Sequence, residues 1–125
     1  MPNLTLTKRF LTLGLIGIAF VCSILFLFPN NALLTVALII LSVLVIKINF
    51  QLKDLFIFFL AILIGTTGDI LSTSAGAWQF TFPVFLNIPL WIPVSWGCNM
   101  LIIYKLADCL TEIYQSYQIR KEKGN

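Results

Sequence analysis

The sequence contains no histidine and few charged residues. None of its 125 residues is His, and Asp, Glu, Lys and Arg together make up only 10%. Without histidine, a Ser-His-Asp triad and the commonest zinc and haem sites are excluded. With so few charges, the chain has too little polar surface to cover a soluble globule. These absences remove most familiar enzyme mechanisms and argue against a water-soluble protein.

Cysteine is also scarce, and its spacing predicts no site. The three cysteines, Cys22, Cys98 and Cys109, form no C-x-x-C pair, and an odd number cannot pair completely within one chain. We interpret them as small buried hydrophobic residues and predict no metal site and no cofactor. The basic residues do not interleave with aromatic residues, so we expect no nucleic-acid partner.

Long apolar runs take up most of the chain. Hydrophobic residues make up 59% of it, and the mean hydropathy is +0.98. A helix of ~20 apolar residues crosses the ~30 Å hydrocarbon core of a bilayer. We therefore predict an all-α, polytopic membrane protein, a single domain over residues 1–125 with a short cytoplasmic C-terminal tail. The four predicted transmembrane helices span about residues 10–28, 32–50, 55–74 and 89–110. No A-x-A-like cleavage site follows the first run, so we expect a retained helix there and no signal peptide.

The basic residues all fall on one side of this predicted bundle. They precede the first apolar run, lie between the apolar runs of the second and third helices, or follow the apolar run of the fourth, with Lys47 and Lys105 near the ends of their predicted helices: Lys8, Arg9, Lys47, Lys53, Lys105, Arg120, Lys121 and Lys123. Cytoplasmic loops of membrane proteins carry such an excess of Lys and Arg. The pattern predicts cytoplasmic N- and C-termini in a multi-pass protein of the cytoplasmic (plasma or inner) membrane.

Asp69 is an acid within the third predicted helix. It lies ~22 Å along the helix axis from Asp54, which places it in the outer half of the membrane. Acids are rare at this depth in a membrane and often mark a functional site, so we hypothesise a function for Asp69. Helical spacing aligns polar residues on the facing sides of the third and fourth helices, and Gly65 and Gly68 are expected to permit a close approach. The candidate catalytic residue is Asp69, and the candidate ligand-binding residues are Ser72, Thr73, Trp78, Trp91, Ser95, Trp96 and Asn99.

Three segments around this candidate site carry a resemblance. Gly68-Asp69, the aromatic stretch 76–81 and the proline- and tryptophan-containing segment 88–96 are similar to the carotenoid-biosynthesis membrane-protein family, which includes carotenoid hydratases. Small uncharacterised bacterial membrane proteins share these features. The resemblance covers about residues 65–100, and the chain has Asp69 where that family has Glu. It implies that Asp69 protonates or orients water at an isoprenoid double bond, while Trp78 and Trp96 stabilise positive charge.

These patterns leave several functions open. The first is a membrane protein that binds a lipid-like or isoprenoid molecule around Asp69, with or without acid chemistry. The second is an oligomeric small transporter or channel subunit in which Asp69 couples protons. The third is a structural or assembly protein, in which Asp69 only hydrogen-bonds between helices. The expected partners are membrane lipids, such a ligand, and a second copy of the chain.

Overall fold

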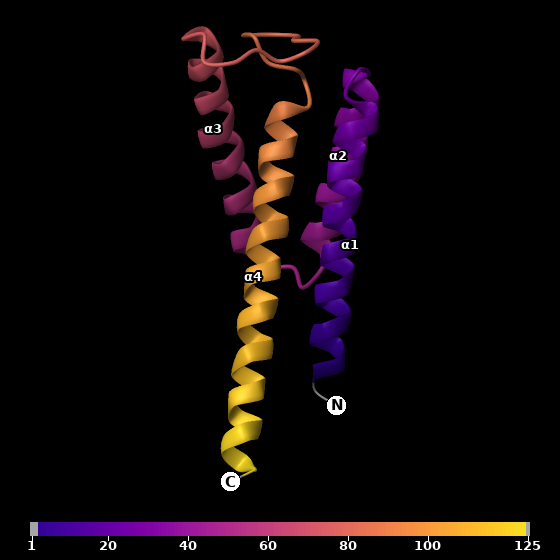
Figure 1. Ribbon diagram of the computed structural model, residues 1–125, viewed down its shortest axis with the longest axis vertical. Helices are drawn as coiled ribbons and strands as arrows, with labels where there is room; N and C mark the ends of the chain where they lie inside the picture. Colours follow the sequence, from indigo (N-terminus) through magenta and orange to yellow (C-terminus); the bar gives the residue numbers. More distant parts are fainter. Residues whose placement is uncertain (1–2, 125) are drawn as a thin grey trace.

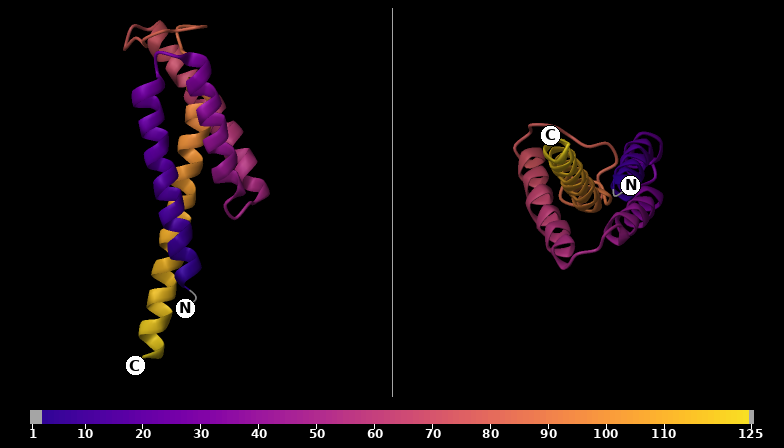
Figure 2. Two further views of the ribbon diagram at one scale, coloured as in Figure 1. Left: turned by 90° about the vertical axis from the view of Figure 1, so that its right-hand side faces the viewer. Right: turned by 90° about the horizontal axis from the view of Figure 1, so that it is seen from below.

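The computed structural model describes residues 3–124, which form four helices and no strand (Figure 1). They are α1 (Asn3–Leu27), α2 (Asn31–Lys47), α3 (Leu52–Ser74) and α4 (Ile92–Lys123). The chain is therefore all-α, as predicted. Helix α4 packs against each of the other three helices and lies between α3 on one side and the α1–α2 pair on the other (Figure 2).

Two of the helices are long and apolar enough to cross a membrane. They are residues Thr5–Leu27 of α1 and Leu52–Ser74 of α3, while α2 is a shorter apolar helix. Only 11% of the apolar window of each long helix is buried inside the protein, unlike the core helix of a soluble fold. Leu, Ile, Val and Phe side chains cover the outer faces of these helices. An apolar exterior suits lipid as solvent, so these helices indicate membrane association.

The helix boundaries differ from those predicted. Helix α1 begins before the first apolar run, because Lys and Arg are good helix formers and a charge does not end a helix. Helix α2 ends at Lys47 and not near 50, since Asn49 has a left-handed φ of 52°. Helix α4 begins at Ile92, after the predicted 89, and continues through the expected tail to Lys123. The hydrophobic runs marked the apolar parts of the helices and not their ends.

Local signals in the sequence explain where α2 and α3 begin and end. The Asn30 side chain accepts a hydrogen bond from the Leu33 N–H and caps α2. Gln51 and Asp54 form a reciprocal capping box at the start of α3. At its end Gly76 has a φ of 84°, and the Ala77 N–H bonds to the Ser72 carbonyl. This left-handed glycine turn stops α3 and starts the loop that leads back to α4.

The loop at residues 75–91 folds over the end of the bundle opposite the N-terminus (Figure 1). The Asn31 side chain donates a hydrogen bond of 3.1 Å to the Phe82 carbonyl, which ties the loop to the start of α2. The ring of Phe28, after α1, lies 6.2 Å from the Phe82 ring. Within the loop, Ile88 and Pro89 are fully buried. The aromatic loop is therefore attached to α1 and α2 as well as to α3 and α4.

The main hydrophobic core lies between α1, α2 and α4. Its buried members are Leu13, Ile16, Phe20, Leu34, Leu38, Val45, Cys98, Leu101, Ile102 and Cys109. None of these residues comes from α3, which contributes only half-buried side chains. Helix α3 is instead joined to α4 by close contacts and polar bonds, and these define the candidate site.

Candidate functional site

Asp69 and Trp96 form a hydrogen bond between α3 and α4. The indole Nε1 of Trp96 donates to the Oδ2 atom of Asp69 across 2.7 Å. Asp69 is 7% exposed, although it lies on a helix whose outer face is apolar. The 2.7 Å separation is at the short end of the range for an N–H···O hydrogen bond. The carboxyl group is thus held at the interface between α3 and α4.

Two glycines allow α3 and α4 to come this close. A Cβ atom at Gly65, one turn before Asp69, would overlap the indole ring of Trp96. A Cβ atom at Gly97 would overlap the ring of Phe58 in the same way. Small residues at such contacts let helix backbones approach closely in membranes. Gly68 does not take part, because a Cβ there would meet no atom within 4 Å, so the prediction of a close approach at Gly68 was wrong.

Two cavities flank the Asp69–Trp96 pair. The larger, about 580 Å³, is the α3–α4 groove, and it is lined by Ile57, Leu60, Ala61, Ile64, Gly65, Gly68, Asp69, Ser72, Trp78, Trp96, Met100 and Tyr104. The second, about 390 Å³, is the outer cavity, and it is lined by Phe20, Asp69, Trp78, Phe80, Ile92, Ser95, Trp96 and Asn99. Asp69, Trp78 and Trp96 line both, so the acid lies at the junction of the two spaces.

Most of the predicted site residues surround this junction. Ser72 lines the α3–α4 groove, and Ser95 and Asn99 line the outer cavity. Trp78 comes from the loop and borders both cavities while remaining partly exposed. The Ser95 hydroxyl also donates a hydrogen bond of 2.7 Å to the carbonyl of Ile92 in its own helix.

Two predicted site residues do not reach Asp69's side chain. The Thr73 hydroxyl bonds to the main-chain carbonyls of Asp69 and Ile70 within α3, and Thr73 lines neither cavity. Trp91 lines a separate cavity of about 250 Å³ beside Phe80 and Phe28. Its indole Nε1 is buried without a hydrogen-bond partner among residues 3–124. The structure therefore separates these two side chains from the Asp69 pair.

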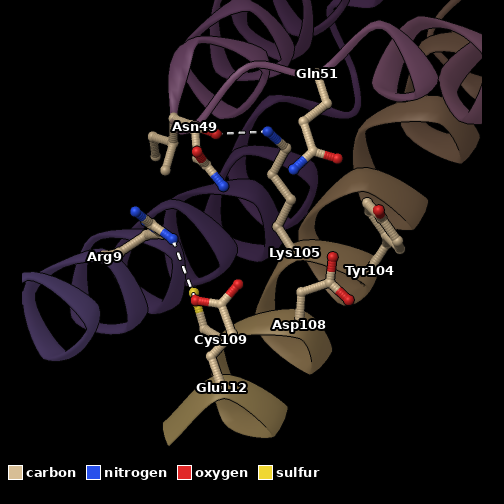
Figure 3. Close-up of a pocket in the computed structure, with 9 residues that line it drawn as sticks. Arg9, Asn49, Gln51, Tyr104, Lys105, Asp108, Cys109 and Glu112 are labelled. Carbon is tan, nitrogen blue, oxygen red and sulfur yellow. Dashed lines mark hydrogen bonds and ion pairs between the residues drawn. The ribbon is translucent and has the colours of Figure 1, made fainter. Parts of the chain in front are cut away.

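A second polar cluster at the opposite end of α3 was not predicted. The Lys105 Nζ atom lies 2.8 Å from the Asp54 Oδ2 atom and also donates to the Ile48 carbonyl. Asp54 is 1% exposed and Lys105 6%. Figure 3 shows Lys105 reaching from α4 toward the connection between α2 and α3, with Arg9 and Glu112 facing each other beyond it. The sequence pattern predicted for Lys105 only a role in topology, although a lysine so close to an apolar run suggests a buried partner.

The Oδ1 atom of Asp69, which does not bond to Trp96, determines what the site can do chemically. Within residues 3–124 no protein group donates a hydrogen bond to its Oδ1 atom, and no Lys or Arg lines the α3–α4 groove or the outer cavity. In the same part of the chain no three His, Cys, Asp or Glu side chains cluster as metal ligands. Such a carboxyl group can hydrogen-bond a polar ligand atom, transfer a proton to it or balance a positive charge.

Comparisons of the chain with protein-family models, with curated proteins and with solved structures found no match.

Proposed function

We propose that this protein binds a lipid-like or isoprenoid molecule beside Asp69, in the outer half of the cytoplasmic membrane. The observation that carries the proposal is the junction itself. A nearly buried acid, fixed by a 2.7 Å bond from Trp96, borders two apolar cavities, and one of its oxygens has no protein donor in the described chain. An acid is costly at this depth in a membrane, and an oxygen without a protein donor is free to accept a hydrogen bond from a ligand.

The proposal includes a topology of four spans with both termini in the cytoplasm. The inner-side basic residues Lys47 and Lys53 lie at one end of α2 and α3, and the uncharged loop 75–91 lies at the other. The positive-inside rule then places Asp69 toward the outer side. The short apolar length of α2 is compatible with a span, because Lys47 can extend its ammonium group to the interface.

Acid chemistry is the further part of the proposal. By the resemblance to carotenoid hydratases, Asp69 would give a proton to an isoprenoid double bond, and the indole faces of Trp78 and Trp96 would stabilise the resulting positive charge. Support comes from the position of both indoles, which border the same two cavities as the carboxyl group.

Replacement of Asp69 by asparagine tests the proposal. The amide oxygen of Asn still accepts from Trp96, so the helix interface should survive while the acid is lost. Lipids that co-purify with the protein are identified and quantified by mass spectrometry, and thermal unfolding is followed in the same detergent. Losing a hydrogen bond to a partly buried group costs about 1–2 kcal/mol, so we expect the specifically bound lipid to fall roughly five- to thirtyfold.

Asp108→Asn is the matched control, because Asp108 is an exposed acid of α4 that borders neither cavity of the site. It should leave the bound lipid unchanged. Unchanged lipid in Asp69→Asn would contradict the proposal. If that variant instead lost a pH-dependent flux in proteoliposomes while its bound lipid stayed the same, Asp69 would be a coupling residue of a transporter.

A further inference from the structure

From the two cavities we infer the class and orientation of the ligand: a single-chain amphiphile whose apolar chain lies in the α3–α4 groove and points toward the inner side, while a head without negative charge occupies the outer cavity. This inference rests on the proposed function and adds the ligand's shape, charge and direction to it.

The α3–α4 groove has the form of a long apolar trough. Its lining residues recur every three or four positions on α3 from Ile57 to Ser72, and every four on α4 from Trp96 to Tyr104. Ile57 to Ser72 corresponds to ~22 Å of helix at 1.5 Å per residue. The polar members Asp69 and Ser72 lie near the outer end, and the stretch between them and Tyr104 is almost entirely hydrocarbon. A linear acyl or isoprenoid chain fits such a trough.

Gly68 is the position that opens this trough. It lies on the groove-lining face of α3, and a Cβ atom there would meet no protein atom within 4 Å. Gly65, one turn earlier, is filled by the Trp96 indole instead. The missing side chain at Gly68 therefore leaves space beside Asp69 that the protein itself does not fill.

The outer cavity has the chemistry of a head site. Its polar side chains are Asp69, Ser95 and Asn99, and the rest of its lining is aromatic or aliphatic. No Lys or Arg lines it in the described chain, so a phosphate or carboxylate head would lie beside an acid without a counter-charge. A hydroxyl group can bond to the free Oδ1 atom, and an ammonium group would in addition be attracted by Asp69 and the faces of Trp78 and Trp96.

The reverse orientation would place the head at the inner end of the groove. The Tyr104 hydroxyl there is buried without a hydrogen-bond partner among residues 3–124, and the Lys53 Nζ atom lies 5.1 Å from the centre of the Tyr104 ring. That end would favour a phosphate head. The polar and aromatic residues gather instead around Asp69, where a cavity of about 390 Å³ shares Asp69, Trp78 and Trp96 with the groove. The pocket that shares Tyr104 with the groove at the other end holds only about 20 Å³, which is too small for a phosphate head.

Photolabelling measures the orientation directly. The full-length protein in phosphatidylcholine nanodiscs is labelled with two palmityl alcohol probes, one with a diazirine at the chain end and one with a diazirine beside the hydroxyl-bearing carbon. We expect the chain-end probe to label Ile57, Met100 or Tyr104 and the head-end probe to label Trp78 or Trp96, as mapped by peptide mass spectrometry. An exchanged pattern would overturn the inference.

Competition then tests the charge of the head and the kind of chain. Unlabelled palmityl alcohol and palmitylamine should each reduce labelling, whereas palmityl phosphate should not. Comparing how strongly farnesol and palmityl alcohol reduce labelling shows whether the groove prefers an isoprenoid or an acyl chain. Palmityl phosphate as the strongest competitor would overturn the inferred head chemistry.

A groove-blocking variant separates this inference from the proposed function. Gly68→Leu adds a side chain on the groove-lining face, where its Cβ meets no protein atom within 4 Å, so chain-end labelling should fall by roughly tenfold or more. Gly14→Leu on α1 is the matched control, because a Cβ at Gly14 also meets open space. If Asp69→Asn loses bound lipid but Gly68→Leu labels normally, the chain position is wrong and the proposed function remains. If neither variant changes binding, both are wrong.

Discussion

At the scale of single residues, neighbouring positions of one type have opposite roles. Gly65 and Gly68 lie one turn apart on α3, but only Gly65 contacts the Trp96 ring, while Gly68 borders open space. Both residues look alike in the sequence. What separates them is the position of one indole ring, which is itself oriented by the bond from its Nε1 atom to Asp69.

A pair of alanine substitutions tests this difference. Gly65→Ala should destabilise the protein by roughly 1–3 kcal/mol, because the added methyl group overlaps the Trp96 indole in a packed contact. Gly68→Ala should leave stability unchanged to within about 1 kcal/mol, since its methyl group enters the groove. Unfolding of both variants in one detergent by denaturant or heat measures the difference. Equal stability of the two variants would mean that α3 and α4 do not approach as closely as described.

Hydroxyl groups show why helical spacing alone does not identify ligand-binding residues. Thr73 and Ser95 both donate to main-chain carbonyls of their own helices, as do Ser42 and Thr67 elsewhere. In an apolar surrounding, a Ser or Thr side chain most easily satisfies its donor within the same turn. Such residues need no ligand, and so Asp69, whose Oδ1 atom has no donor in the described chain, carries more of the functional argument than they do.

At the scale of helices, α4 organises the molecule. It packs against α1 and α2 through the hydrophobic core, and it contacts α3 through the Gly65–Trp96 and Gly97–Phe58 approaches. Polar bonds toward both ends of α3 strengthen the second contact, with the Asp69–Trp96 bond toward the loop 75–91 and the Asp54–Lys105 pair at the start of α3. Helix α3 is thus attached to the bundle through α4 alone for most of its length, which leaves room for the groove beside it.

The Asp54–Lys105 ion pair should stabilise the protein only when both side chains are present. Lys105→Met leaves Asp54 buried without its cation, and breaking a buried ion pair in this way costs about 3–5 kcal/mol. Asp54→Leu combined with Lys105→Met removes both charges, and this double variant should recover most of the lost stability. A double-mutant cycle of unfolding free energies gives the coupling between the two side chains. Additive losses would show that Lys105 and Asp54 stabilise the fold separately.

At the scale of the whole molecule, the distribution of charge defines two different ends. The basic residues lie toward the chain ends and around the α2–α3 connection, and the uncharged aromatic loop lies at the opposite end and covers the start of α4 (Figure 1). The loop is bonded to α2 through Asn31 and Phe82, and its Trp78 reaches both cavities. The proposed ligand site is therefore at the uncharged end.

Cysteine labelling tests the proposed topology. In a background with Cys22, Cys98 and Cys109 replaced by alanine, Gln79→Cys and Lys123→Cys are each treated with a membrane-impermeant maleimide. In intact cells we expect label only at position 79, because positive charge keeps the other end in the cytoplasm. In inverted membrane vesicles only position 123 should react. Labelling of both positions from one side would show that α4 does not cross the membrane and would contradict the four-span topology.

Sequence alone was sufficient for the all-α class, the apolar character of α1 and α3 and the choice of Asp69 as the residue to examine. The physical reason is that composition, helical periodicity and the high cost of an acid in lipid act locally along the chain. The four-span topology and the ligand stay predictions. The helix ends were predicted less well, because Lys8, Arg9 and the residues after Leu110 continue helices beyond their apolar parts.

Only the tertiary structure decided which side chains meet. The 2.7 Å bond between Trp96 and Asp69, the different surroundings of Gly65 and Gly68, and the burial of Asp54 with Lys105 all depend on the rotation of α3 against α4. Periodicity says which residues share a helix face, but the facing of two helices is determined by packing between them. That packing keeps the Thr73 and Trp91 side chains away from the two cavities beside Asp69 and forms the groove that no linear pattern predicted.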